Sequence, residues 1–205
     1  MIIDYSKIKN IDTSIFKKHF NFPEYPYSVD KGHPDATHHL FREGEHYQFL
    51  VYLTMMYDDV LILDVGTSWG ESAVSLSQNP KNRVISYDIL KRWVGNPFSD
   101  YTNLEFKIMD INKEDENLIK SAKIIFLDIA HDGQQEWVFT DMLTRIGYQG
   151  YVVCDDIHSP NYRMMDAWWD SLRIEKYDIT DGLKKYPHGM GLINYYQDGN
   201  IEFIN

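Results

Sequence analysis

Acidic residues stand at the ends of five apolar segments, where such side chains can bind a ligand or cap a helix. They are Asp64, Asp88, Asp110, Asp128 and the adjacent pair Asp155 and Asp156. A carboxylate directly before a helix often serves as its N-cap, so one or two of these need no ligand. Five segments in succession favour a binding edge, because ligands of open parallel sheets lie beyond the carboxyl ends of the strands.

The last of these carboxylates suit a cation. Asp128, Asp155 and Asp156 would repel one another on adjacent strand ends unless a proton or a cation neutralised them. Ligands that are all oxygen favour Mg²⁺. His131 follows Asp128 by three residues and can face the same pocket as a general base. The alternatives are a solvated acidic rim, with Asp155 as a helix cap, and a surface or capping role for His131.

A glycine-spaced turn follows the first acidic strand end, in LILDVGTSWGESAVSLS, residues 61–77. A phosphate-binding P-loop is excluded because Glu71, and not a lysine, follows Gly70. A dinucleotide fingerprint is disfavoured because Ser68 stands where a third glycine is needed. Asp88 ends the second strand, where a carboxylate can accept both hydroxyls of a ribose. The pattern predicts a ligand that has a ribose and needs no diphosphate.

Apolar strands alternate with helical segments from residue 60 onward. The strands are VLILDV, RVISYDI, LEFKIMD, KIIFLDI and YVVCDDI, and the segments between them are residues 70–78, 92–96, 113–121 and 134–146. This alternation is typical of βαβ units around a parallel sheet. A helix over Tyr162–Leu172 then precedes IEKYDIT, GMGLINYY and IEFI, whose spacing leaves no room for crossover helices. We therefore predict an α/β fold: a Rossmann-like, doubly wound, mostly parallel seven-stranded sheet with an antiparallel C-terminal edge and helices on both faces.

Composition limits the class of protein. The 205 residues, 43% hydrophobic and 25% charged, suit one globular domain over 1–205. The net charge of −11 argues against a nucleic-acid partner. Cys154 is the one cysteine, so an internal disulfide is excluded and a reducing compartment is favoured. With neither a signal-peptide pattern nor a membrane-spanning apolar run, we expect a cytoplasmic protein without membrane insertion.

D-x-G-x-x-x-G followed by E-S-A, with Asp88 and Asp110 after it, resembles the cofactor site of class I S-adenosylmethionine-dependent methyltransferases. The resemblance implies that the glycine turn admits the methionine moiety, whose ammonium suits a nearby carboxylate. It also implies that Asp88 holds the ribose and that Asp110 lies near the adenine. The residues assigned to the cofactor are Asp64, Gly66, Thr67, Ser68, Gly70, Ser72, Asp88 and Asp110.

The later segments IIFLDIAHDG and GYQGYVVCDDIH resemble the metal-dependent sugar O-methyltransferases of the macrocin/mycinamicin type, grouped with cephalosporin hydroxylase and rhamnosyl O-methyltransferase sequences. This resemblance implies that Asp128, Asp155 and Asp156 bind Mg²⁺ or another divalent cation, and that His131 acts as the base. The implied acceptor is a hydroxyl of a sugar or glycan, such as a deoxyhexose. A homo-oligomer and a place within a larger glycan-processing enzyme are both left open.

Residues 1–57 differ from the core, residues 58–205, in their aromatic and histidine content. A helix around Ser14–Phe20 and another from about Glu43 are predicted here. We expect this segment, with the helix over Tyr162–Trp169, to wall the acceptor site. Three other functions compete: a catechol or phenol O-methyltransferase, a nicotinamide-dependent oxidoreductase and a non-catalytic binding module. A sugar hydroxyl is less acidic than a catechol, so His131 as an added base favours the sugar.

Overall fold

The computed structural model describes residues 1–12, 14, 20, 25–26, 46–158, 163–183, 188–196 and 200–204. Its strands are β1 (Ile2–Asp4), β2 (Leu61–Val65), β3 (Arg83–Asp88), β4 (Leu104–Ile108), β5 (Ile124–Leu127), β6 (Tyr151–Cys154), β7 (Lys176–Asp178), β8 (Gly191–Asn194) and β9 (Glu202–Ile204). Its α-helices are α1 (Tyr5–Lys9), α4 (His46–Met55), α5 (Glu71–Leu76), α6 (Glu116–Ser121), α7 (Gln134–Ile146) and α8 (Arg163–Ser171). Short 3₁₀ turns cover η2 (Ile111–Lys113) and η3 (Thr180–Gly182).

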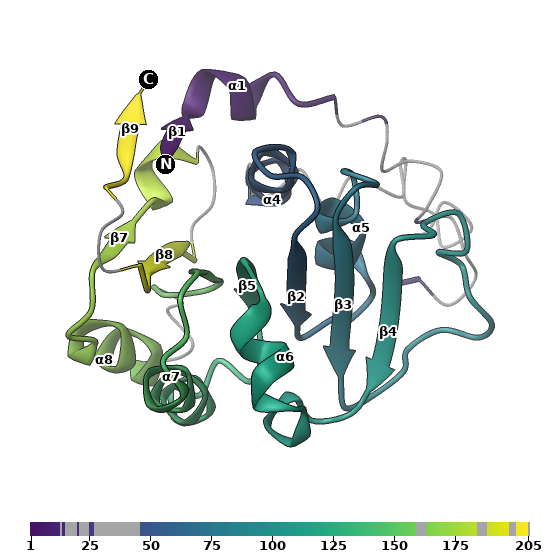
Figure 1. The fold of residues 1–205 in the computed structure, drawn as a ribbon. Coiled ribbons are helices and arrows are strands. Elements are labelled where there is room, and N and C mark those ends of the chain that lie inside the picture. The colour runs from purple at the N-terminus through teal and green to yellow at the C-terminus, as the bar shows by residue number, and fades with distance from the viewer. Residues whose placement is uncertain are drawn as a thin grey trace.

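Seven strands form one sheet in the order β4-β3-β2-β5-β6-β8-β7 (Figure 1). The first five in this order run parallel, and β8 runs antiparallel to both of its neighbours. The chain order reverses between β2 and β5, so the carboxyl ends of these two strands flank the switch point where such sheets bind ligands. The predicted fold class is confirmed, including the antiparallel C-terminal edge.

Helices cover both faces of the sheet, with α4 and α5 on one and α6, α7 and α8 on the other (Figure 1). The strands serve both faces because their side chains alternate. In β2, Leu63 packs toward α6–α8 and Ile62 toward α4; in β5, Ile125 and Phe126 divide in the same way. This double burial explains why the strands are continuous apolar runs. Within the described ranges, every helix is too short or too polar to cross a membrane.

Two expectations were wrong. IEFI was expected at the antiparallel edge, but Glu202–Ile204 pairs in parallel with β1 in a separate two-stranded sheet. Strands that are adjacent along the chain often pair, but here the two ends of the chain pair with each other. Ile3 of β1 is buried, and the Met1 ammonium donates to the backbone oxygen of Asn200 at 2.7 Å. Residues 92–96 form no helix; Gly95 has a φ of +68° and the residues adopt bends.

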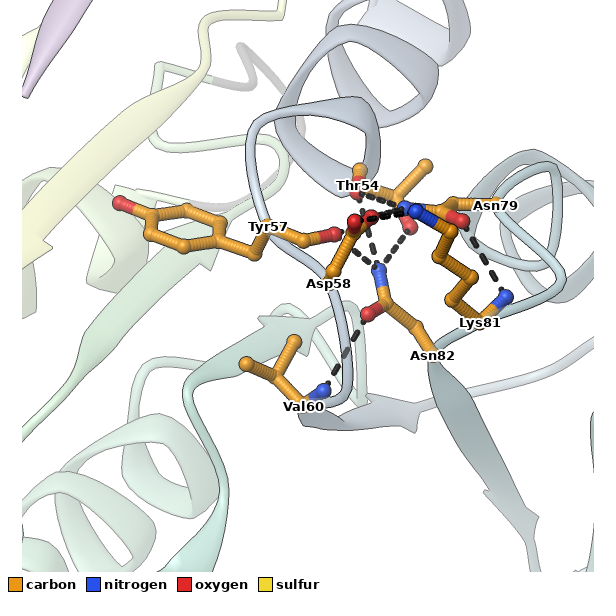
Figure 2. Close-up of polar contacts among 7 residues, drawn as sticks. All are labelled: Thr54, Tyr57, Asp58, Val60, Asn79, Lys81 and Asn82. Atoms are coloured by element: carbon orange, nitrogen blue, oxygen red, sulfur yellow. Dashed lines mark hydrogen bonds and ion pairs between the residues drawn. The ribbon is translucent and has the colours of Figure 1, made fainter.

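The C-terminal end of α4 is anchored by two asparagine side chains (Figure 2). Asn82 donates to the backbone oxygens of Thr54 at 2.9 Å and Tyr57 at 3.0 Å, and Asn79 donates to the latter at 2.7 Å. The Asn82 carbonyl also accepts the N–H of Val60 at 3.2 Å, directly before β2. Carbonyls at a helix end lack partners within the helix, so these amides satisfy them. They thereby fix α4 against β2 and the loop that leads to β3.

Candidate active site

A polar pocket lies at the carboxyl ends of β2 and β5. Its volume is about 270 Å³, and it is lined by Tyr47, Gly66, Thr67, Ser68, Trp69, Glu71, Ser72 and Asp128. The turn after β2 supplies most of this wall, α4 supplies Tyr47, and β5 is followed directly by Asp128. The predicted helix around Ser14–Phe20 lies largely outside the described residues, and the adjacent histidines His38 and His39 lie wholly outside them.

The two glycines of the turn are required by close packing within the protein. Gly66 has a φ of +105°, and a Cβ there would lie 1.6 Å from the backbone oxygen of Asp128. Gly70 has a φ of +96°, and a Cβ there would lie 2.6 Å from the ring of Phe98. The sequence suggested that both glycines make room for a ligand. In the structure they let the turn pack against the end of β5 and against Phe98, and Gly66 also lines the pocket.

Asp64 lies beneath the turn and has no exposed surface. Ser86 donates its hydroxyl to Asp64 Oδ2 at 2.5 Å, which leaves Thr67 as the donor in its bond with Ser86. Burial raises the pKa of Asp64 to about 7, although hydrogen bonds from Ser86 and Ser72 act in the opposite direction. Within the described part of the chain, Asp64 Oδ1 accepts no hydrogen bond. Asp64 therefore supports the turn from below, and its side chain does not line the pocket.

Asp88 holds the turn from the neighbouring strand. Its Oδ2 accepts the N–H of Ser68 at 2.8 Å, and its Oδ1 accepts the N–H of Leu90 at 2.9 Å. Each carboxylate oxygen has a further lone pair, so Asp88 can still accept ribose hydroxyls. Asp110, at the end of β4, caps η2 by accepting the N–H of Asn112 at 3.0 Å. The capping role alone accounts for its position.

Asp128 and His131 lie side by side, as the spacing in the sequence predicted. His131 Nε2 is 2.7 Å from Asp128 Oδ1 and 3.8 Å from Asp156 Oδ2. Burial alone would lower the pKa of His131, but the hydrogen bond to Asp128 and the charges of Asp128, Asp156 and Asp155 raise it to about 9. Glu136 positions the loop by accepting the backbone N–H of His131 at 2.8 Å. A protonation site thus stands among three carboxylates at the edge of the pocket.

The predicted cation ligands Asp128, Asp155 and Asp156 fit a divalent cation in their chemistry. All are hard oxygen donors, which is the ligand type that Mg²⁺ and similar cations prefer. Across the ranges that the structure describes, however, no three His, Cys, Asp or Glu side chains are already arranged to hold a metal ion. In this arrangement the His131 imidazole takes the contact with Asp128 Oδ1.

Three residues that line the pocket were missed as site residues: Glu71, Trp69 and Tyr47. Glu71 is 7% exposed, and burial raises its pKa to about 7. Its position directly after Gly70 could have signalled its place at the turn. Tyr47 comes from α4, and burial, followed by the charge of Glu71, raises its pKa well above the usual value. The sequence carries no signal for Tyr47, because only the packing of α4 brings it to the pocket.

The tryptophans of α8 pack the sheet. Trp168 is fully buried, and its indole N–H donates to Thr140 Oγ1 at 3.3 Å. Trp169 is also buried, so neither ring belongs to the exposed acceptor wall expected over Tyr162–Trp169. The other predicted part of the wall is residues 1–57. There Tyr47 does line the pocket, whereas Ile3 and Ile8 are core residues.

Comparison with known proteins relates the chain to others through structure. No protein-family model matches the sequence, and a search of curated proteins finds no relative. The structure is similar to methyltransferase PaMTH1 of Podospora anserina, solved with S-adenosylhomocysteine bound: the TM-score is 0.59 and the identity 15%, over 94% of this chain and 93% of that one.

Two O-methyltransferases have structures that are similar to a smaller share of this chain. One, from Bacillus cereus and in complex with S-adenosylhomocysteine, has a TM-score of 0.55 and 14% identity, over 73% of this chain and 80% of that one. The other is CalS11, a TDP-rhamnose 3′-O-methyltransferase of calicheamicin biosynthesis, with a TM-score of 0.51 and 9% identity, over 73% and 78%. The chain thus has the fold of S-adenosylmethionine-dependent methyltransferases.

Proposed function

We propose that the chain is an S-adenosylmethionine-dependent O-methyltransferase. The observation that carries this proposal is the polar pocket at the glycine turn, which adjoins the Asp128–His131 pair at the carboxyl edge of a methyltransferase-type sheet. A cofactor at the turn and an acceptor beside His131 would then be neighbours. Holding both reactants in place supplies much of the rate of such a transfer.

The cofactor would lie along the turn and the end of β3. Asp88 would accept the ribose hydroxyls with the lone pairs that Ser68 and Leu90 leave free. Thr67 and Ser72 also line the pocket, and their hydroxyl oxygens can accept hydrogen bonds from the cofactor. Asp64 would contribute from below by fixing Ser86, which in turn fixes Thr67.

We further propose that Asp128, Asp155 and Asp156 hold Mg²⁺ or another divalent cation. When bound, S-adenosylmethionine supplies a methyl group on a sulfonium, and the cation lowers the pKa of an acceptor hydroxyl. The carboxylates are hard oxygen ligands, which this class of cation prefers. A bound cation would also offset the repulsion among them, which the protein otherwise reduces by holding a proton on His131.

His131 would accept the hydroxyl proton at the ring nitrogen that does not face Asp128, as the oxygen–carbon bond forms and the carbon–sulfur bond breaks, leaving a neutral thioether. Asp128, at 2.7 Å, would stabilise the imidazolium that results. A base must be neutral before it accepts a proton, and positive charge bound to the neighbouring carboxylates favours that neutral form. The backbone bond from His131 to Glu136 would keep the ring in place during the transfer.

A sugar is the acceptor that this arrangement fits best. Its hydroxyls are weakly acidic, so a base beside the carboxylates is useful, whereas a catechol can ionise on a cation alone. The similarity in fold to a TDP-rhamnose 3′-O-methyltransferase supports a deoxyhexose acceptor. We therefore propose that the chain methylates a hydroxyl of a sugar or glycan.

The test is a transfer assay with S-adenosylmethionine labelled on its methyl group. The purified protein is incubated with deoxyhexosides, nucleotide-linked deoxyhexoses and catechols, with Mg²⁺ or with EDTA. We expect transfer to a sugar in the presence of Mg²⁺ only. Transfer that survives EDTA would exclude the cation, and transfer to catechols alone would exclude the sugar. If no acceptor is methylated and S-adenosylhomocysteine does not bind to the protein, the proposed function is wrong.

Variants of two histidines test the base. His131→Ala should lower turnover by about 10²–10⁴-fold while leaving the binding of S-adenosylhomocysteine intact. His158→Ala is the matched control, because His158 also contacts two carboxylates, Asp166 at 3.1 Å and Asp178 at 2.6 Å, but lies outside the pocket. Equal turnover in both variants would exclude His131 as the base.

A further inference from the structure

Glu71 is placed in the pocket in a way that Asp64 is not. Its side chain lines the pocket although the residue is 7% exposed, whereas Asp64 has no exposed surface. Burial raises the pKa of its carboxyl group to about 7, although the Tyr25 hydroxyl and the backbone of Glu71 and Trp69 act in the opposite direction. A carboxylate at this position has lone pairs for a donor from a ligand.

The described residues that line the pocket include acidic side chains and no basic side chain that could neutralise them. Glu71 and Asp128 are its two acidic residues, and none of the lining residues that the structure describes is Lys, Arg or His. Asp128 Oδ1 already contacts His131 Nε2 at 2.7 Å. Glu71 is therefore the carboxylate that a small cationic group in this pocket would meet without displacing His131. Burying a carboxylate is costly unless it is paired, and such a group would provide the pair.

We propose that Glu71 binds the α-ammonium group of the cofactor; this inference rests on the proposed function. An ammonium has three N–H donors and no acceptor, so it matches a carboxylate that has lone pairs to spare. The α-carboxylate of the same moiety would meet the hydroxyl donor of Tyr47, which lines the pocket with Glu71. Recognition would thus separate the two ends of the amino acid by charge. From the sequence, Asp64, and not Glu71, is assigned to the cofactor.

Calorimetry with two ligands tests the proposal. One ligand is S-adenosylhomocysteine, and the other is the analogue that lacks only its α-amino group. Both are titrated, in the presence of EDTA, into the full chain, into Glu71→Gln and into Glu136→Gln. The last is the matched control, because Glu136 is also a buried carboxylate, 2% exposed, but bonds the backbone of His131 outside the pocket lining. Circular dichroism establishes that each variant is folded.

We expect the unmodified chain to prefer S-adenosylhomocysteine to the deaminated analogue. Glu71→Gln should weaken the binding of S-adenosylhomocysteine about 10- to 100-fold, the range for a hydrogen bond to a charged group, and leave the analogue nearly unaffected. Glu136→Gln should keep the preference.

If the unmodified chain binds both ligands equally, or if Glu71→Gln retains the preference, the inference is wrong and the proposed function still stands. If the unmodified chain binds neither ligand, the proposed function is wrong as well. If Glu71→Gln does not fold, Glu71→Asp replaces it, and unchanged binding of both ligands by that variant, whose carboxylate is withdrawn by one methylene, would refute the inference.

Discussion

Asp64 should make the free energy of unfolding fall as pH rises. Its pKa is raised from 3.8 to about 7 by burial, so between these values the folded protein binds more protons than the unfolded chain. Stability then decreases with pH across this window and levels off above pH 7. A shift of this size corresponds to about 4 kcal/mol in all, of which about 2 kcal/mol falls between pH 5.5 and 8.5.

Urea unfolding followed by circular dichroism at pH 5.5, 6.5, 7.5 and 8.5 measures this effect. Asp64→Asn removes the titrating group and keeps an acceptor for Ser86, so its stability should fall by about 2 kcal/mol less than that of the unmodified chain over the same range. Asp115→Asn is the control, since Asp115 is an exposed N-cap of α6 and asparagine caps equally well. Parallel pH profiles for the unmodified chain and Asp64→Asn would show that Asp64 is not the titrating group.

Three further changes have expected outcomes. Asp88→Ala should weaken the binding of S-adenosylhomocysteine in calorimetry, because it removes two charge-assisted hydrogen bonds of ~1.5–3 kcal/mol each; unchanged affinity would contradict its role. Gly66→Ala should unfold the protein or lower its free energy of unfolding by more than ~3 kcal/mol, because the new Cβ would lie 1.6 Å from a backbone oxygen. Gly95→Ala is the control: its Cβ would meet nothing within 4 Å, so only ~1–3 kcal/mol of backbone strain is expected in urea unfolding. Lys123→Met should lose ~1–2 kcal/mol by the same measurement, because Lys123 Nζ lies over three tyrosine rings, at 4.4 Å from that of Tyr196.

The central strands and their acidic ends could be predicted because their signal is local. An apolar run buried on both faces of a sheet stays apolar at every position, and a carboxylate such as Asp128 marks where it ends. The pairing of β1 with β9 could not be predicted in this way. Each strand has three residues, too few to show a period, and their partnership joins opposite ends of the chain.

The site was predicted where its residues are close in sequence and missed where packing assembles it. Asp128 and His131 share one loop, so their spacing placed them together. Tyr47 reaches the pocket through the packing of α4. Asn79 and Asn82 anchor the far end of this helix across more than twenty residues of sequence. Trp168 was predicted to lie in the acceptor wall, although it packs the sheet. The sequence cannot separate these positions, since an aromatic residue on an amphipathic helix can face either the sheet or a ligand.

The acidic residues at the strand ends have a second use, which the sequence could not show. The non-glycine residues with positive φ at this edge are Ser68, His131 and Asp156, at 45°, 54° and 56°. Each has its backbone N–H bound by a carboxylate: Ser68 by Asp88 at 2.8 Å, His131 by Glu136 at 2.8 Å and Asp156 by Asp155 at 3.0 Å.

Such backbone conformations cost of the order of 1–3 kcal/mol each, and a hydrogen bond from an N–H to a carboxylate offsets a similar amount. The carboxylates of Asp88, Glu136 and Asp155 therefore hold the strained turns in place. Removing one of them changes both the local backbone and any ligand contact. Asp88→Asn separates the two effects at Ser68, because its one carbonyl oxygen can still accept the N–H of Ser68 while the charge that would strengthen a bond from a ribose hydroxyl is lost. The amide group that replaces the other oxygen cannot accept the N–H of Leu90, so that bond is lost as well.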